Sequence, residues 1–94
     1  MGYESVLLKL SGEALSASGD AILDRGAIDT IAAQIRDVTS TGVRLAVVVG
    51  AGNILRGRDV TDVVETQATA DQMGMLATMI NGLALMDGLE RNGV

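Results

Sequence analysis

Two strand-to-loop corners decide the fold of this chain: Val6–Glu13, which reads VLLKLSGE, and Val47–Gly57, which reads VVVGAGNILRG. In each corner an apolar run with little alternation stops at small residues and glycine, as a strand covered on both faces does. Bare backbone N–H groups at such a strand end, together with a cation, are how proteins hold phosphate. The sequence therefore predicts an α/β protein with an anion site at one edge of a parallel sheet.

A helix is predicted between the two strands. Asp24 is a favourable N-cap, and Gly42 suits a left-handed stop. Between them, apolar residues recur at intervals of three and four, at Ile28, Ile31, Ile35 and Val38. A strand over 5–10, this helix and a strand over 43–49 make a right-handed βαβ unit, whose strands must be parallel.

The chain after the second corner divides into a polar segment over 56–66 and an apolar helix over 73–89. Thr69 and Gln72 have the spacing of a capping box that would start this helix. Two apolar stripes follow it: Met73, Leu76, Ile80 and Leu83 in one, and Met75, Met79 and Met86 in the other. One stripe can pack on the βαβ unit, so the other predicts contact with a second copy of the chain.

Composition limits the class of protein. The 94 residues are 48% hydrophobic, carry a net charge of −5 and contain neither Cys nor His. One domain fits this length, while disulfides, thiolate or imidazole metal sites and Ser-His catalysis are excluded. Without a cluster of Lys and Arg we expect no nucleic-acid partner. With no basic leader and no apolar run near the ~20 residues of a membrane span, we expect no membrane partner and a cytoplasmic location.

The first corner offers a candidate catalytic cation. Lys9 could neutralise phosphoryl oxygens that the Ser11 and Gly12 amides receive, since phosphoryl transfer depends on positioning and electrostatic stabilisation. Equally, a lysine at a strand end can simply extend its charge into water. The sequence of this corner alone leaves both interpretations open.

The second corner and the last helix offer two more candidates. The two glycines Gly50 and Gly52, followed by Asn53 and Arg56, suit an anion approached by backbone and clamped by a guanidinium. A plain βα turn with an exposed arginine would have the same sequence. Leu55 stands where a dinucleotide-binding G-x-G-x-x-G motif needs its third glycine, which argues against that fold. Asp71, in the predicted first turn of the helix, could bind ribose hydroxyls or merely favour the helix dipole.

Three runs together resemble the bacterial UMP kinases of the amino acid kinase superfamily. They are LLKLSGEAL over 7–15, GAGNILRG over 50–57 and DQMGMLATMINGLAL over 71–85. The resemblance covers nearly the whole chain. It implies a three-layer αβα sandwich with a mainly parallel sheet, of which residues 1–94 form a single incomplete domain, the N-terminal portion.

The same resemblance implies transfer of the ATP γ-phosphate to UMP, giving UDP, with Mg²⁺, in a homohexamer that GTP activates and UTP inhibits. By position, the implied ATP-binding residues are Lys9, Leu10, Ser11, Gly12, Gly52 and Arg56, with Lys9 catalytic. Ala51 is implied to contact UMP through its backbone, and Asp71 to hold the UMP ribose. No residue is implied as a metal ligand.

The chain departs from that family in three places. Ala51 stands where the family usually has a third consecutive glycine. The glycine-rich stretch linked to GTP activation falls on 17–22, and the segment 16–21 has lost most of the expected glycines. Family members also continue through a second half that supplies adenine contacts, more of the UMP site and a catalytic carboxylate, so we expect the 94 residues alone to be inactive. Two alternatives stay open: a related kinase acting on a carboxylate or carbamate, and a non-catalytic binding or assembly module.

Overall fold

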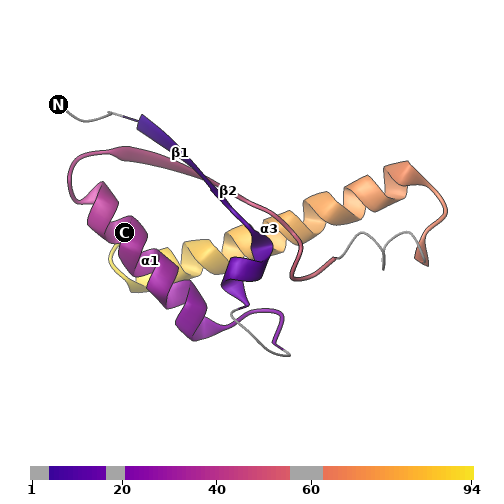
Figure 1. Ribbon diagram of the computed structural model, residues 1–94, viewed down its shortest axis with the longest axis horizontal. Coiled ribbons are helices and arrows are strands. Elements are labelled where there is room, and N and C mark those ends of the chain that lie inside the picture. The colour runs from indigo at the N-terminus through magenta and orange to yellow at the C-terminus, as the bar shows by residue number, and fades with distance from the viewer. Residues whose placement is uncertain (1–4, 17–20, 56–62) are drawn as a thin grey trace.

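The computed structural model describes residues 5–16, 21–55 and 63–94. Strand β1 (Ser5–Leu10) leads into a short 3₁₀ helix, η1 (Gly12–Leu15), which precedes helix α1 (Arg25–Thr39). Strand β2 (Arg44–Val49) and the long helix α3 (Gln67–Arg91) complete the described elements (Figure 1). Strands β1 and β2 pair in parallel, with Ser5 opposite Arg44 and Leu10 opposite Val49. The predicted α/β class and the predicted parallel strand pair are confirmed.

The local signals around α1 act as the sequence predicts. The Asp24 carboxylate caps the helix by accepting a hydrogen bond from the Ala27 amide at 2.8 Å. Gly42, just beyond the end of α1, has a φ of +93°, a conformation that residues with a Cβ rarely adopt. The chain can therefore leave α1 and turn directly into β2.

Both helices lie on one face of the sheet. Alternate residues of the strands point to that face, and four of them pack against the buried core of the helices: Leu8, Leu10, Leu45 and Val47. On the other face Leu7 is 63% exposed and Val48 is 48% exposed. The described residues thus form the sheet and one helical layer of the predicted sandwich, and the expectation of strands covered on both faces is not met within them.

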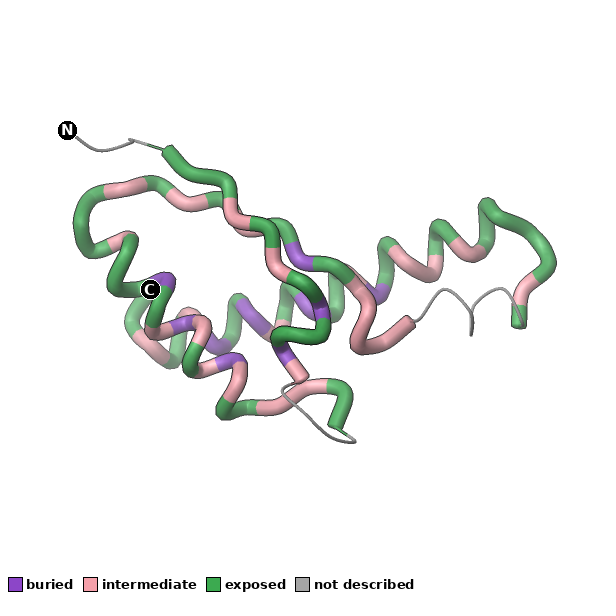
Figure 2. Tube along the Cα trace, viewed as in Figure 1, coloured by how far each residue is buried: buried purple, intermediate pink, exposed green. Residues whose placement is uncertain are grey.

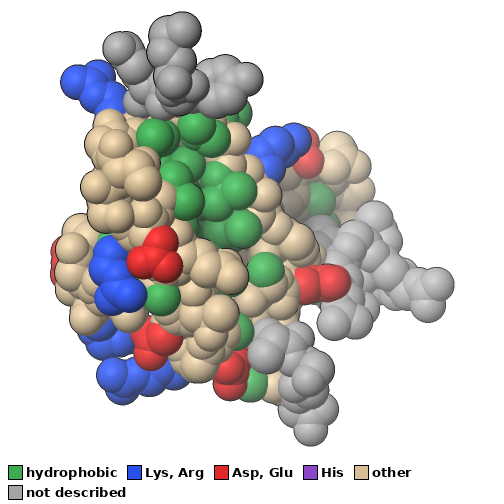
Figure 3. Space-filling view, turned by 60° about the vertical axis from the view of Figure 1, so that its left-hand side comes forward, with side chains coloured by type: hydrophobic (Ala, Val, Ile, Leu, Met, Phe, Trp, Pro, Cys, Tyr) green, Lys and Arg blue, Asp and Glu red, His purple; other side chains and the backbone are tan. Residues whose placement is uncertain are grey.

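The core lies where the strands end, not where they begin. Leu15, Ile28, Ile35, Val49 and Leu85 form its buried cluster. Figure 2 shows buried residues gathered where η1, α1 and the C-terminal half of α3 come together. At the opposite end, from which the strands start, hydrophobic side chains gather on the molecular surface (Figure 3). The packing is therefore densest beside the two corners.

Helix α3 starts earlier than predicted. Thr66, not Thr69, is its N-cap: the Thr66 hydroxyl oxygen accepts a hydrogen bond from the Thr69 amide at 3.2 Å and donates to Thr69 Oγ1 at 2.7 Å. The proposed capping box of Thr69 and Gln72 is therefore wrong, because Thr69 is the partner of a cap one turn before it. Strand β2 likewise begins at Arg44, one position later than predicted.

The buried face of α3 has two small residues, one polar residue and a single leucine. Ala77, Asn81, Leu85 and Gly88 are buried, whereas both predicted apolar stripes are largely exposed, with Met79 at 62% and Leu76 at 61%. The expectation that one stripe packs on the βαβ unit is wrong. Small residues let the backbone of α3 come close to α1, and a bulky stripe would hold the two helices apart.

An ion-pair cluster fastens the end of α3 to α1. The Arg91 guanidinium donates to the Asp29 carboxylate at 2.8 Å and also pairs with Asp87. The hydrogen bond from Arg91, helped by one from Asn92, holds the pKa of Asp29 below its usual range even against partial burial. The Asn92 amide group also donates to the Gly88 carbonyl at 2.8 Å, which closes the C-terminus of the helix.

The two helices approach each other closely at Gly88. A Cβ placed there would lie 2.4 Å from Ile28 Cγ2, and the β-branched Ile28 has few other rotamers in a helix. We expect Gly88→Ala to lower the free energy of unfolding by about 1–3 kcal/mol. Gly82→Ala is the matched control on the same helix, because nothing lies within 4 Å of a Cβ at Gly82.

In the control variant, replacing an exposed helical glycine by alanine should raise stability by about 1 kcal/mol. Urea unfolding of both variants measures the two effects. Equal and favourable shifts would show that α1 and α3 do not meet at Gly88.

Candidate functional site

The first corner is a capped 3₁₀ turn that follows β1 directly. The Ser11 hydroxyl oxygen accepts a hydrogen bond from the Glu13 amide at 3.2 Å, and the Ser11 carbonyl accepts one from Ala14 at 3.0 Å. The turn therefore starts at Gly12, which is buried. Ser11 has a structural role as the cap, in addition to the ATP contact predicted for it.

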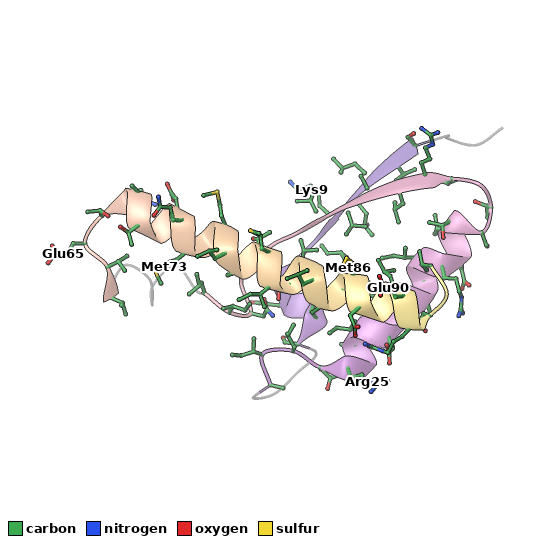
Figure 4. All side chains as sticks on the ribbon, turned by 180° about the vertical axis from the view of Figure 1, so that it is seen from behind. Lys9, Arg25, Glu65, Met73, Met86 and Glu90 are labelled. Carbon is green, nitrogen blue, oxygen red and sulfur yellow. The ribbon has the colours of Figure 1, made fainter. Side chains whose placement is uncertain are left out.

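Lys9 projects from β1 on the side away from α1 (Figure 4). It is exposed and sits opposite Val48 in the sheet. Within the described part of the chain Lys9 takes part in no ion pair. Leu10 points the other way, into the core, and its carbonyl accepts the Gly50 amide at 2.9 Å. The side chain of Lys9 is thus available to a ligand, whereas Leu10 could contribute through backbone alone.

The second corner begins as a tight turn. The amides of Ile54 and Leu55 both donate to the Ala51 carbonyl, at 3.0 and 2.9 Å. Residues 56–62 lie outside the described part of the chain, so the reason to set aside a dinucleotide-binding motif stays Leu55 in place of its third glycine.

The two corners lie in direct contact at Gly12. A Cβ on Gly12 would lie 2.5 Å from Asn53 Oδ1, 2.7 Å from the Gly50 carbonyl oxygen and 2.9 Å from the Gly52 nitrogen. Only a glycine leaves room for this approach, because all three neighbours are polar atoms and two belong to the backbone. The predicted phosphate-binding residues Ser11, Gly12 and Gly52 are therefore brought to one place.

A buried amide pair joins the second corner to α3. Asn81 is completely buried, and its amide nitrogen donates to the Gly50 carbonyl and to Asn53 Oδ1, both at 2.7 Å. The Asn53 nitrogen returns a hydrogen bond to Asn81 Oδ1 at 3.0 Å and donates to the Ile22 carbonyl at 2.8 Å. Asn81 was not among the predicted site residues, and Asn53 was considered only as part of the anion-binding turn. The available signal was a lone asparagine inside an otherwise apolar helix.

A groove beside the second corner brings together the two residues predicted to bind UMP. Ala51 forms one side of it, and the N-terminal half of α3 forms the other. Its volume is about 620 Å³, and it opens to solvent. The α3 residues that line it are Ala70, Asp71, Gly74, Met75, Thr78 and Met79. Residues twenty positions apart in sequence thus meet at one concave surface.

Asp71 lies in the second turn of α3, not in the first turn as predicted, because the helix begins at Gln67. Its carboxylate accepts a hydrogen bond from the Gln67 side chain at 2.8 Å. The helix dipole acts mainly within the first turn, so the purely electrostatic explanation for this aspartate is weakened. A carboxylate held at the rim of a groove suits a ligand with hydroxyl donors.

Two of the predicted elements cannot be placed. Arg56, predicted to bind ATP, lies outside the described residues, and so does most of the segment 17–22. Gly52 is described, and a Cβ there would meet the Glu13 side chain at 3.7 Å, an ordinary contact.

Nearly the whole chain is similar to proteins of known family. The model of the amino acid kinase family matches residues 4–94. The chain belongs to the amino acid kinase family. This match confirms the resemblance to the amino acid kinase superfamily that the sequence suggested. The chain also has the same α/β fold as two solved structures of UMP kinases.

Two crystal structures illustrate that likeness. A UMP kinase from Ureaplasma parvum has a TM-score of 0.90 and 36% identity, over 100% of this chain and 40% of that one. A UMP kinase from Bacillus anthracis has a TM-score of 0.89 and 33% identity, over 97% of this chain and 37% of that one. The chain thus spans about two fifths of the length of these two UMP kinases.

Within residues 5–16, 21–55 and 63–94, no three acidic side chains are grouped so that they could hold a metal ion between them. Mg²⁺ in phosphoryl-transfer enzymes is held by one or two carboxylates together with substrate phosphates, so no described residue is assigned to it. None of the described helices has the length and hydropathy to cross a bilayer.

The close contact at Gly12 can be tested by adding a Cβ there. We expect Gly12→Ala to cost about 1–3 kcal/mol of stability, because its Cβ would overlap atoms that cannot swing away. Gly50→Ala is the control: a Cβ there would lie 3.5 Å from the Gly12 nitrogen, an ordinary distance. Thermal unfolding of both variants measures the difference. If Gly12→Ala proved as stable as Gly50→Ala, the two corners would have to lie further apart.

Proposed function

We propose that the protein carrying this chain is a UMP kinase, and that the chain supplies its acceptor groove and part of its phosphate cradle. In the reaction, a phosphate oxygen of UMP attacks the γ-phosphorus of ATP. The bond from that phosphorus to the bridging oxygen breaks, and UDP and ADP leave. ATP is the phosphoryl donor, and Mg²⁺ would bind together with its phosphates.

One observation carries the proposal: Ala51 and Asp71 line a single groove next to the corner where Gly12 contacts Gly52. An acceptor with a sugar at one end and a phosphate at the other could reach from Asp71 to that corner. Two solved structures that share the fold at 33–36% identity are described as UMP kinases. This supports the same acceptor for the present chain.

The chemistry of the groove favours UMP over the alternative acceptors. Asp71 is an exposed carboxylate on the groove wall, and it would repel the negative charge of a carboxylate or carbamate. Ribose offers hydroxyl donors instead, and charge-assisted hydrogen bonds from hydroxyls to a carboxylate are short and strong. A related kinase for carboxylate or carbamate substrates is therefore the second candidate.

The exposed side of α3 supports the proposed homo-oligomer. Outside the groove, its bulky apolar residues face solvent along the helix: Leu76, Ile80, Leu83 and Met86. A two-fold contact would bury the same stripe from both copies. The hexameric state, the GTP and UTP effects and a cytoplasmic location remain predictions from the resemblance.

Ligand-dependent stability tests the acceptor. A ligand that binds only the folded protein raises its stability, by about 2.7 kcal/mol at a concentration of 100 Kd. We expect UMP to raise the melting temperature of the intact protein, and carbamate and glutamate to have no effect. Asp71→Asn should reduce the UMP shift, whereas the same change at the exposed Asp37 of α1 should not.

The results separate the candidates. Stabilisation by carbamate or glutamate, but not by UMP, would identify the alternative kinase. No stabilisation by any of the three would favour a binding or assembly module. An unchanged UMP shift in Asp71→Asn would reduce Asp71 to a helix-surface charge.

Turnover tests the role of Lys9. In the intact enzyme Lys9→Ala should lower kcat by about 10²-fold or more, the scale seen when a preorganised charge-stabilising group is lost. Arg44→Ala is the matched control, because Arg44 is an exposed cation at the opposite end of the same sheet. Near-normal turnover in Lys9→Ala would show that Lys9 is a solvent-exposed lysine near the end of a strand, with no part in catalysis.

A further inference from the structure

Asn81 is a polar side chain at zero exposure in a helix that otherwise buries Ala77, Leu85 and Gly88 on this face. A buried amide without partners is strongly unfavourable, so its hydrogen bonds decide whether it can be there at all. All of the bonds that Asn81 makes with its side chain lead to the second corner, to Gly50 and Asn53.

Every side-chain N–H group of Asn81 and Asn53 donates a hydrogen bond, and these bonds fix the orientation of both amides. Both N–H groups of Asn81 are used, on Gly50 and Asn53, and both N–H groups of Asn53 are used, on Asn81 and Ile22. Carbonyl oxygens only accept, so the nitrogen of each side chain must face its backbone partner. Neither amide can rotate without losing hydrogen bonds.

We propose that Asn81 and Asn53 act together as positioning residues for the nucleotide site. They fix the turn that begins at Ala51 to the wall of α3, and so set the width of the groove between Ala51 and Asp71. This inference rests on the proposed function for its ligand, but the geometry that it describes is a property of the protein alone.

The pair also controls the contact between the two corners. Gly12 packs against Asn53 Oδ1 and the Gly50 carbonyl, the same two oxygens that Asn81 holds in place. A shift of the pair would therefore move the donor side of the site as well as the acceptor groove. Since a misplacement of about 1 Å can cost about 10²-fold in rate, such a shift would be felt in turnover.

The test compares Asn81→Ala and Asn53→Ala with Asn92→Ala in the intact protein. Asn92 also donates two hydrogen bonds, to Asp29 and Gly88, but at the far end of α3. Asn53 is only half-buried, so we expect Asn53→Ala to fold. This variant tests the same amide pair if Asn81→Ala does not fold. Each variant is studied below its own melting temperature.

Two readouts are used. Amide hydrogen exchange follows the Gly50, Ile54 and Leu55 N–H groups, which are hydrogen-bonded in the corner, relative to amides of α1 in the same sample. Steady-state kinetics gives kcat and the KM for UMP. We expect both site variants to speed exchange in the corner and to lower kcat by about 10²-fold, while Asn92→Ala changes neither.

The double variant adds a check on joint action. If the two amides act as a unit, removing both should lower kcat no further than removing one. Corner exchange and kcat in the site variants equal to those of Asn92→Ala would overturn the proposal. If the wild-type protein does not phosphorylate UMP, the proposed function fails, and the exchange comparison alone decides whether the pair positions the corners.

Discussion

The site depends on one close contact, the packing of Gly12 against the turn at Gly50–Asn53. Parallel strands bring their carboxyl ends to the same edge, but they do not by themselves hold the following loops together. Here the Gly50 amide extends the ladder to the Leu10 carbonyl, and the missing side chain at Gly12 lets the two loops meet. The residues predicted to hold phosphate lie on one surface because of this contact.

Helix α3 has two separate roles along its length. Its C-terminal half is anchored, through Leu85 in the core, Gly88 against Ile28 and Arg91 paired with Asp29. Its N-terminal half extends beyond the sheet and forms the outer wall of the groove (Figure 1). Asn81 lies between these halves. The helix is therefore bound to the corner at the point where its packed C-terminal half gives way to the half that lines the groove.

The sequence predicted the features that depend on local chemistry. The Asp24 cap and the left-handed Gly42 follow from patterns a few residues long, and the parallel strands follow from the order strand, helix, strand. All three are confirmed. The buried face of α3 was missed because hydrophobic pattern favours Met and Leu stripes, whereas close helix contact favours Ala and Gly. Asn81 was missed because its partners lie 28 and 31 positions away, beyond any local pattern.

A ligand in the groove would connect two parts of the chain that are held differently. Ala51 belongs to the corner that Asn81 holds, while Asp71 lies on the half of α3 that extends beyond the sheet (Figure 1). A ligand that binds both sides would stabilise the folded chain through contacts that join this half of α3 to the corner. The chain has Ala51 where the family usually has a glycine, and this places a methyl group on the corner side of the groove. Under the proposed function, the size of the side chain at position 51 therefore bears directly on the space left for the acceptor.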